Sequence, residues 1–338
     1  MAEITIKYLA EKLKLAPSTV SRALNDSHEI SANTKKKVLD LAKELNFQPN
    51  PYARSLREQK SKTIGVIIPE RINNFFSQVI DGMETVTKVH GYHLLVYNSN
   101  EDIEQEKNIL TLLLGGRVDA LVMSISGQNE KSKHLDILKN RTTPVVFFDR
   151  IPHDFPTTKL ITNGYEAGYN GATHLIKKGC RKIIFLVLSK EISIGKERMR
   201  GYLDALKAHN IPFENSWIVV CGHSEAKNID LLENLFYKLD RPDGVLASVE
   251  KLALATYRAL AKTNIKMPDQ VKMISFSNMK IADLLNPPLS TISQPAFEIG
   301  KECANLLMKK LTRKNQPDLE DKTIVLPSQI SLRESTGK

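Results

Sequence analysis

The sequence predicts three parts in order: a small all-α N-terminal domain containing a helix-turn-helix, a hinge helix, and an α/β body of two doubly wound lobes with parallel sheets. Three observations support this organisation. Residues 5–25 hold two short amphipathic helical patterns around a tight turn. Residues 49–61 contain two prolines and few apolar side chains. From residue 63 onward, apolar runs of strand length alternate with helical patterns, which is typical of parallel sheets covered by helices.

The helix-turn-helix is predicted from the stretch TIKYLAEKLKLAPSTVSRALN, residues 5–25. Thr5 is suited to cap a first helix, and Pro17 to open a second one. Apolar residues at helical spacing form the inner face of the first helix: Ile6, Leu9, Ala10 and Leu13. Polar residues form the outer face of the second: Ser18, Thr19, Ser21 and Arg22. This face could enter a DNA major groove, or it could be the solvated side of an ordinary helical hairpin.

A third helix is expected over residues 32–45, with Ser31 before it and with Val38, Leu41, Ala42 and Leu45 closing a three-helix core. The triplet Lys35-Lys36-Lys37 lies in its first turns. These lysines either form a solvated face or contact phosphates.

The hinge follows as FQPNPYARSLR, in which Pro51 can open a helix of one or two turns. Such a helix buries little, so it should be marginal in the free protein. It is apolar at Ala53 and Leu56 and basic at Arg54 and Arg57. This combination suits insertion into a minor groove, although a plain interdomain linker is the alternative.

The body is predicted from alternating strand and helix patterns in two successive series. The first series has strands at 64–69, 92–98, 118–124 and 144–149 and helices at 75–89, 103–114 and 131–138. The second has helices at 164–177, 198–209, 229–239 and 252–262 and strands at 182–188, 217–220, 243–248 and 271–276. Residues 289–295, a helix at 299–311 and strands at 323–327 and 329–334 come last and are expected to cross back between the lobes. Ligands in such a pair bind in the cleft at the carboxyl ends of the strands.

Charge and composition agree with a nucleic-acid module attached to a nearly neutral body. Residues 1–60 contain eleven Lys and Arg against seven Asp and Glu, which places +4 of the net charge of +10 in this segment. The three cysteines, at 180, 221 and 303, form neither a disulfide framework nor a CxxC pair. No signal-peptide pattern opens the sequence, and we expect a protein of the cytoplasm, associated with the nucleoid.

The sequence carries none of the common catalytic motifs. It has no GxxxxGK[ST], no GxSxG, no HExxH and no GxGxxG after a strand. We therefore expect no enzymatic activity, no metal and no cofactor. A solute-binding protein would share the two-lobe body, but such proteins are normally exported and lack a helical head.

Eleven segments follow one another in the order and spacing of a known family: STVSRALN, FQPNPYARSLR, KTIGVIIP, NNFF, GYHLLVYNSN, RVDALVM, PVVFFDR, HLIKKGCRKIIFL, RMRGYLDAL, PPLSTISQP and LRES. Through them the chain resembles the lactose/galactose-repressor (LacI/GalR) family of bacterial transcription factors over essentially its full length. The resemblance implies a body like that of periplasmic binding proteins, a homodimer, a near-palindromic DNA operator and a small-molecule effector that is a carbohydrate or a carbohydrate derivative.

The resemblance also implies a division of the chain. Residues 1–48 would be the DNA-binding domain, 49–61 the hinge, and 62–338 the effector-binding and dimerisation domain. Within the last, the N-lobe would take about 62–161 and 293–324, and the C-lobe about 162–292 and 325–338.

Matching positions imply roles at the DNA. Ser18, Thr19 and Arg22 would face base edges, with Arg22 the best candidate for a bidentate contact to guanine. Residues at or near phosphates would be Thr5, Ser21, Asn25, Asn33 and Asn50. In the hinge, Leu56 would be inserted, next to Ala53 and Arg57. Ala16 stands where the family usually has Ser, so the capping hydroxyl of the recognition helix is lost.

The implied effector site comprises Phe75, Asp149, Arg150, Arg198, His223, Glu250 and Ser277. Arg198 matches the Arg that most regularly holds the ligand, although a salt bridge at the cleft edge is its alternative role. Two departures matter: relatives have Asn-Asp where this chain has Val249-Glu250, and Asp where it has Ser277. Either the ligand is anionic and uses Arg150 and Arg198 together, or the carboxylate of the cleft has moved to Glu250.

Overall fold

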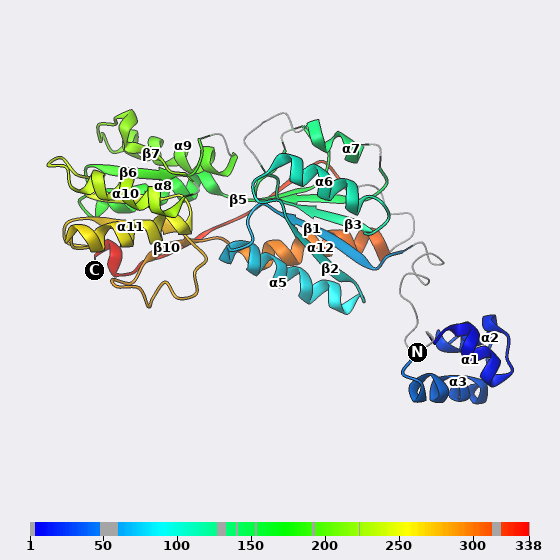
Figure 1. Ribbon diagram of the computed structural model, residues 1–338. Helices are drawn as coiled ribbons and strands as arrows, with labels where there is room; N and C mark the ends of the chain where they lie inside the picture. Colours follow the sequence, from blue (N-terminus) through cyan, green and yellow to red (C-terminus); the bar gives the residue numbers. More distant parts are fainter. Residues whose placement is uncertain are drawn as a thin grey trace. The chain divides into compact units, whose positions relative to one another are not determined.

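The computed structural model describes residues 4–47, 60–126, 133–139, 141–152, 154–190, 193–222, 224–312 and 319–337. The chain forms two compact units, Met1–Ser61 and Lys62–Lys338. The second unit contains two six-stranded sheets, each covered by helices (Figure 1).

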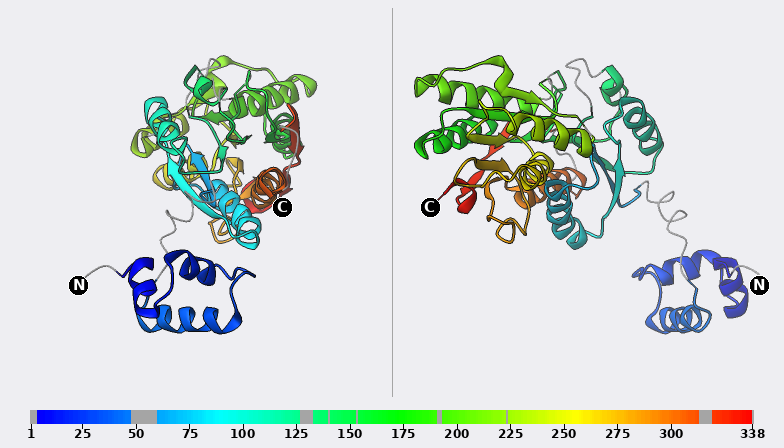
Figure 2. Two further views of the ribbon diagram at one scale, coloured as in Figure 1. Left: turned by 90° about the vertical axis from the view of Figure 1, so that its right-hand side faces the viewer. Right: turned by 60° about the vertical axis from the view of Figure 1, so that its left-hand side comes forward.

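The first unit is a bundle of α1 (Ile6–Leu13), α2 (Pro17–Leu24) and α3 (Ala32–Glu44) (Figure 2). Thr5 and Ser31 cap α1 and α3 as expected, since their hydroxyls accept from the N–H groups of Tyr8 and Thr34. α2 begins at Pro17 without a side-chain cap. The buried core is small and apolar: Leu9, Ala10, Val20, Ala23, Val38 and Ala42.

The N-lobe sheet has the strand order β11-β5-β4-β3-β1-β2, and every pair is parallel. Its strands are β1 (Thr63–Ile68), β2 (His93–Asn98), β3 (Ala120–Met123), β4 (Val145–Phe148), β5 (Lys159–Thr162) and β11 (Thr323–Leu326). Two helices lie on one face, α6 (Ile103–Leu113) and α7 (Asp136–Lys139), and two on the other, α5 (Asn74–Val89) and α12 (Ala296–Thr312) (Figure 1).

The N-lobe differs from the expectation at two places. The strand β5 was not predicted, because KLIT is short and follows a polar loop. In the described part of the helix expected at 131–138, the chain makes a 3-10 turn, Lys133–Leu135, and then only the four residues of α7.

The C-lobe sheet has the order β12-β10-β9-β8-β6-β7, parallel except for the antiparallel pair β10–β12. Its strands are β6 (Ile183–Val187), β7 (Ile218–Val220), β8 (Gly244–Ala247), β9 (Lys272–Phe276), β10 (Ser290–Ser293) and β12 (Gln329–Ser331). Its helices are α8 (Gly164–Lys177), α9 (Ser193–Ala208), α10 (Glu225–Phe236) and α11 (Glu250–Thr263). α9 begins at Ser193, one turn before the start expected from the apolar pattern.

Three segments join the lobes: the links from β5 to α8, from β10 to α12 and from β11 to β12. The first and third are tied together, because the Ser328 N–H donates to Oδ1 of Asn163 at 2.7 Å. β11 belongs to the N-lobe sheet and extends to Leu326, so the division expected at residue 324 falls inside this strand.

Helices α8 and α9 cross so closely that only glycine fits between them. A Cβ on Gly168 would lie 2.2 Å from the carbonyl oxygen of Arg198, and one on Gly201 would lie 2.0 Å from that of Tyr165. This crossing fixes the backbone of Arg198 relative to α8.

The three cysteines are buried and unpaired, as expected of small core residues. Among the helices in the described ranges, none is both long and apolar enough to cross a membrane.

Candidate functional site

The exposed side of α2 presents the residues predicted to contact DNA. Ser18 and Arg22 are exposed, while Thr19 and Ser21 are half-buried. Their positions follow from the opposite face, where Val20 and Ala23 are buried in the three-helix core. The surface is therefore a row of small hydroxyls with one long cation, which is a suitable shape and chemistry for a major groove.

Within residues 4–47, two ion pairs hold cations of this domain. Arg22 Nη1 lies 2.9 Å from Oε2 of Glu29, in the loop after α2. Lys35 Nζ lies 2.7 Å from Oδ1 of Asp26 and also donates to the Asp26 carbonyl oxygen at 3.3 Å. Lys35 is thus held by the loop before α3, whereas Lys36 and Lys37 are exposed.

The other DNA candidates are placed as follows. Thr5 is exposed and caps α1, and Asn25 is exposed with its side-chain amide donating to the Ser21 carbonyl oxygen at 2.7 Å. Asn33 is exposed in the first turn of α3. Asn50, Ala53, Leu56 and Arg57 lie outside the described residues.

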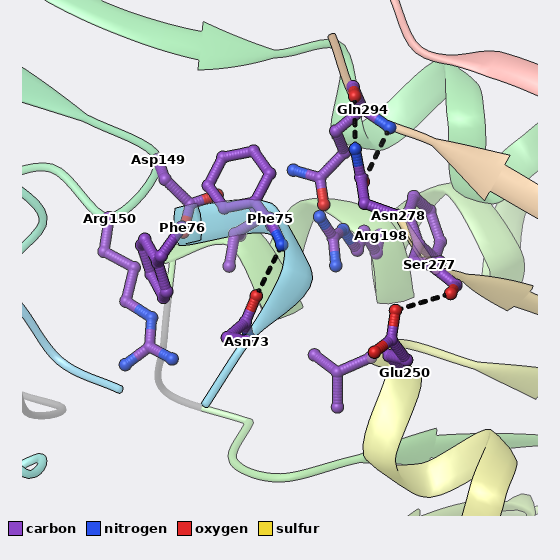
Figure 3. A pocket seen from close by; sticks show the side chains of 13 residues that line it. Asn73, Phe75, Phe76, Asp149, Arg150, Arg198, Glu250, Ser277, Asn278 and Gln294 are labelled. Atoms are coloured by element: carbon purple, nitrogen blue, oxygen red, sulfur yellow. Dashed lines mark hydrogen bonds between the residues drawn. The ribbon is translucent and has the colours of Figure 1, made fainter. Parts of the chain in front are cut away.

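The body has a cavity at the carboxyl ends of the strands, between the lobes. Its empty volume is about 460 Å³, part of it open to solvent. Six of the seven predicted effector residues line it together: Phe75, Asp149, Arg150, Arg198, Glu250 and Ser277 (Figure 3). His223 lies outside the described residues.

An aromatic cluster forms the N-lobe wall. Asn73 caps α5 by accepting from the Phe75 N–H at 2.9 Å, which fixes the start of the helix next to the cavity. The Phe75 ring meets Phe76 edge-on at 5.3 Å between centroids and stacks on Phe148 at 6.5 Å. The cavity therefore has one rigid apolar side.

Arg150 is already paired. Its Nη1 lies 2.8 and 2.6 Å from the two carboxylate oxygens of Glu101, and the side chains of both residues are largely buried. The expectation that Arg150 and Arg198 act together on an anionic ligand is therefore modified, because Glu101 neutralises the first of these charges.

Arg198 is buried, and two of its donors have no partner among the described residues. Nη1 donates to the Ser248 carbonyl oxygen, and the guanidinium lies over the Phe276 ring at 4.0 Å. Nε and Nη2 are the donors without partners. Burial lowers the pKa of Arg198 to about 10, so the side chain is cationic at neutral pH. Buried unpaired donors are costly, and an acceptor group in the cavity would satisfy them.

Asp149 contributes a buried carboxyl group, and its backbone adopts the left-handed conformation with φ of 60°. Burial raises the pKa of Asp149 above its ordinary range, and the charges of Arg150 and Arg198 offset part of this effect. The group can accept hydrogen bonds when ionised and donate one when protonated.

Glu250, at the start of α11, supplies a second carboxylate. Its Oε2 accepts from the Ser277 hydroxyl at 2.7 Å (Figure 3). Its Oε1 accepts from the side-chain amide of Asn74 at 2.6 Å. Ser277 thus orients a carboxylate that relatives would carry at its own position. This arrangement favours the second alternative from the sequence, a carboxylate moved to Glu250.

Glu250 also takes part in a set of contacts that join the lobes, which we call the lobe latch and which consists of three pairs. In addition to Asn74–Glu250, Lys251 Nζ lies 3.0 Å from Oε1 of Glu70. Gln78 and Asn278 exchange two hydrogen bonds of 2.9 and 3.1 Å. Asn74 and Gln78 are four residues apart on α5 and lie on one face of this helix, whereas Glu70 lies in the loop before it.

Sequence reasoning did not select seven further lining residues: Asn73, Phe76, Ile194, Val249, Phe276, Asn278 and Gln294. Four of them are next in the chain to a predicted site residue: Phe76, Val249, Phe276 and Asn278. Their position beside a predicted residue is the signal by which the sequence could have identified them. Gln294 belongs to the link from β10 to α12, and only the three-dimensional crossing brings it to the cavity. The described residues contain no group of three or more His, Cys, Asp or Glu that could hold a metal ion.

Comparisons with known proteins agree with both regions. Residues 5–50 match the profile of bacterial regulatory proteins of the lacI family, and residues 61–333 match periplasmic binding proteins and sugar-binding domains of the LacI family. The transcriptional repressor PurR of Aliivibrio fischeri strain MJ11 is 30% identical over 334 residues, covering 95% of this chain and 98% of that protein.

Two solved structures are similar as well. The lac repressor dimer bound to operator and the anti-inducer ONPF has a TM-score of 0.84 at 20% identity, with 100% of both chains covered. A LacI-type regulator from Alkaliphilus metalliredigens QYMF, complexed with D-xylulofuranose, has a TM-score of 0.71 at 26% identity, covering 82% of this chain and all of that one.

These matches span the exposed α2 face and the cavity between the lobes alike, and the family they define consists of regulators and not of enzymes. The chain belongs to the LacI family of bacterial transcriptional regulators, with a DNA-binding helix-turn-helix domain followed by a ligand-binding body.

Proposed function

We propose that the protein is an operator-binding repressor whose affinity for DNA is set by a sugar or sugar derivative bound between the lobes. The observation that carries the proposal is the arrangement of opposite hydrogen-bonding groups in one cavity. Arg198 offers two unpartnered donors, while Asp149 and Glu250 offer acceptors. A polyhydroxylated molecule presents acceptors and donors together, so it can satisfy both sides at once.

The apolar wall supports the same class of ligand. The face of a sugar ring carries C–H groups, which pack well against an aromatic side chain such as Phe75. The related regulator from Alkaliphilus metalliredigens holds D-xylulofuranose, a sugar without charge.

Binding would act on DNA affinity through the lobe latch. A ligand hydroxyl that donates to Glu250 competes with Asn74 for the same carboxylate, so ligand contact and lobe closure share one group. In a homodimer, a change in lobe position would alter the spacing of the two hinge segments, residues 49–61, and of the Arg22 side chains on the two half-sites. Coupling between two such sites is about 1–3 kcal/mol, or roughly 5–150-fold in operator affinity.

The test combines a ligand screen with DNA titration. Candidate sugars, sugar acids, nucleosides and nucleobases are added to the purified full chain, and those that raise the unfolding midpoint are kept, since a ligand that binds only the folded state stabilises it. The operator is obtained by selection from random DNA. We expect a sugar-class ligand to change operator affinity, and we expect this response to disappear in Arg198→Met. Binding of nucleobases alone, or ligand binding without any change in operator affinity, would contradict the proposal.

A further inference from the structure

A second cavity adjoins the first and differs from it in charge. It has an empty volume of about 300 Å³ including open solvent, and it lies at the carboxyl ends of β6 and β8. Its lining residues are Arg150, Val187, Leu188, Ser189, Ile194, Gly195, Arg198, Ser248 and Val249. Arg150, Ile194, Arg198 and Val249 line both cavities, so the two cavities are neighbours that share Arg198.

The carboxylates in the described lining belong to the first cavity. Asp149 and Glu250 line that cavity, whereas the described residues that line the second are two arginines, two serines and apolar residues, with no carboxylate among them. Because Arg150 is already paired with Glu101, Arg198 is the cation of this lining that an anion would bind. The site as a whole is thus polarised, with acceptors at one end and donors at the other.

The second cavity also receives the start of a long helix. α9 runs for 16 residues from Ser193, and both Ile194 and Gly195 of its first turn line the cavity. This first turn, residues 193–196, contains no Asp or Glu. The aligned peptide dipoles therefore direct partial positive charge into the cavity, an environment that stabilises phosphate and carboxylate groups.

An independent observation at the same place points to a ligand. Arg198, on the second turn of α9, is 3% exposed, yet Nε and Nη2 have no partner in the described structure. The close crossing with Gly168 holds the Arg198 backbone at this place. A bound anion would satisfy both donors in the bidentate manner typical of guanidinium groups.

We infer that the effector carries an anionic group, a phosphate ester or a carboxylate, which binds at the start of α9 against Arg198, while its hydroxyl groups bind Asp149 and Glu250. The inference rests on the proposed function, since it names the class of ligand for the same site. The effector is accordingly a phosphorylated or acidic sugar and not the neutral parent sugar.

The experiment compares glucose, fructose and ribose with the phosphate monoesters of each, by calorimetry on the full chain. We expect a monoester to bind at least about tenfold more tightly than its parent sugar, as expected for a charge-assisted pair. Ser189→Asp places a carboxylate in the second cavity alone, and it should reverse this preference. Arg198→Met should abolish it. Arg200→Met is the matched control, because Arg200 lies on the same helix with its side chain 60% exposed and paired with Glu197; it should keep the preference.

The outcomes separate the two proposals. If a neutral sugar binds as tightly as its ester and changes operator affinity, the anionic subsite is wrong and the effector-controlled repressor stands. If the preference for the ester persists in Ser189→Asp, the anion binds elsewhere and the inference fails. If none of the six probes binds the wild-type chain, the sugar class itself is contradicted. Inorganic phosphate is tested as a further probe beside the three sugar and ester pairs. If phosphate stabilises the wild type and Arg198→Met equally, its binding is non-specific, which counts against the subsite.

Discussion

The Ser277 hydroxyl donates a 2.7 Å hydrogen bond to one carboxylate oxygen of Glu250, and Asn74 donates to the other at 2.6 Å. The pair joins the ends of two neighbouring strands, β8 and β9, with α5 of the opposite lobe. The carboxylate that relatives carry after β9, at the position of Ser277, is supplied here by Glu250 at the start of α11. Ser277 now orients this carboxylate.

Glu250→Gln should weaken effector binding. It keeps the size of the side chain but removes the charge, so we expect a loss of about 1.5–3 kcal/mol, roughly tenfold to a hundredfold in Kd by calorimetry. The double variant Glu250→Gln with Ser277→Asp returns a carboxylate to the neighbouring strand and should recover part of the affinity. Glu233→Gln, on α10, is the control and should bind normally. Full affinity in Glu250→Gln would exclude a direct role for this carboxylate.

Asp149→Asn should flatten the pH dependence of stability. The unfolded carboxyl titrates near about 3.9, whereas burial raises the pKa of Asp149 in the folded state. Between these two pKa values the folded state binds more protons, so its stability falls as pH rises through the window. An Asn at this position imitates the protonated form and has no such dependence.

The measurement for this variant is thermal unfolding of the ligand-free chain from acid to mildly alkaline pH. The difference in Tm between Asp149→Asn and wild type should be near zero at the acid end and should grow in favour of the variant as pH rises. A difference that is constant with pH would show that Asp149 titrates as it does in the unfolded chain.

Arg22→Ala should reduce operator affinity and relax sequence preference. Loss of a bidentate contact to guanine costs about 1–3 kcal/mol at that base pair and little elsewhere. Titration of the selected operator and of a variant with the guanine replaced measures both effects. Lys36→Ala is the control. Loss of this exposed lysine should weaken binding to both duplexes equally and reduce the salt dependence of binding. Unchanged discrimination in Arg22→Ala would move base recognition to other residues.

Ala16→Ser should stabilise the N-terminal domain. α2 lacks a side-chain cap, and a Ser hydroxyl at Ala16 can accept from an N–H of its first turn. Helix N-caps of this kind contribute about 0.5–2 kcal/mol. Urea unfolding followed by far-UV circular dichroism reports the change, with Lys14→Ser as a control outside the cap. Unchanged stability in Ala16→Ser would show that Pro17 alone is enough to set the helix start.

Gly201→Ala should destabilise the C-lobe. The added Cβ would lie 2.0 Å from the Tyr165 carbonyl oxygen, and backbone atoms on both helices would have to shift. Overpacking of this kind costs about 1–3 kcal/mol, which lowers Tm by several degrees. Gly115→Ala is the control, since its nearest neighbour would be 3.4 Å away. Equal Tm values for the two variants would show that α8 and α9 can separate without cost.

Sequence patterns predicted the parts whose signals are local. Thr5 and Ser31 are recognisable caps, and the apolar runs that became β1, β3 and β6 are unambiguous. β5 was missed because its four residues contain a single apolar pair, Leu160-Ile161, between Lys159 and Thr162, and because its pairing with the distant β11 leaves no local pattern. The pairing of Arg150 with Glu101, and the short length of α7, depend on contacts between segments far apart in the chain. No pattern in one sequence contains them.

The hydrogen bond between Ser328 and Asn163 has a mechanical consequence. Of the three links between the lobes, the one from β5 to α8 and the one from β11 to β12 are joined by this bond. A rotation that keeps the bond must move both links together. On the other side of the cavity, Glu70, Asn74 and Gln78 face their partners in the C-lobe. A molecule that parts the lobes would break these three contacts while the two links stay joined to each other.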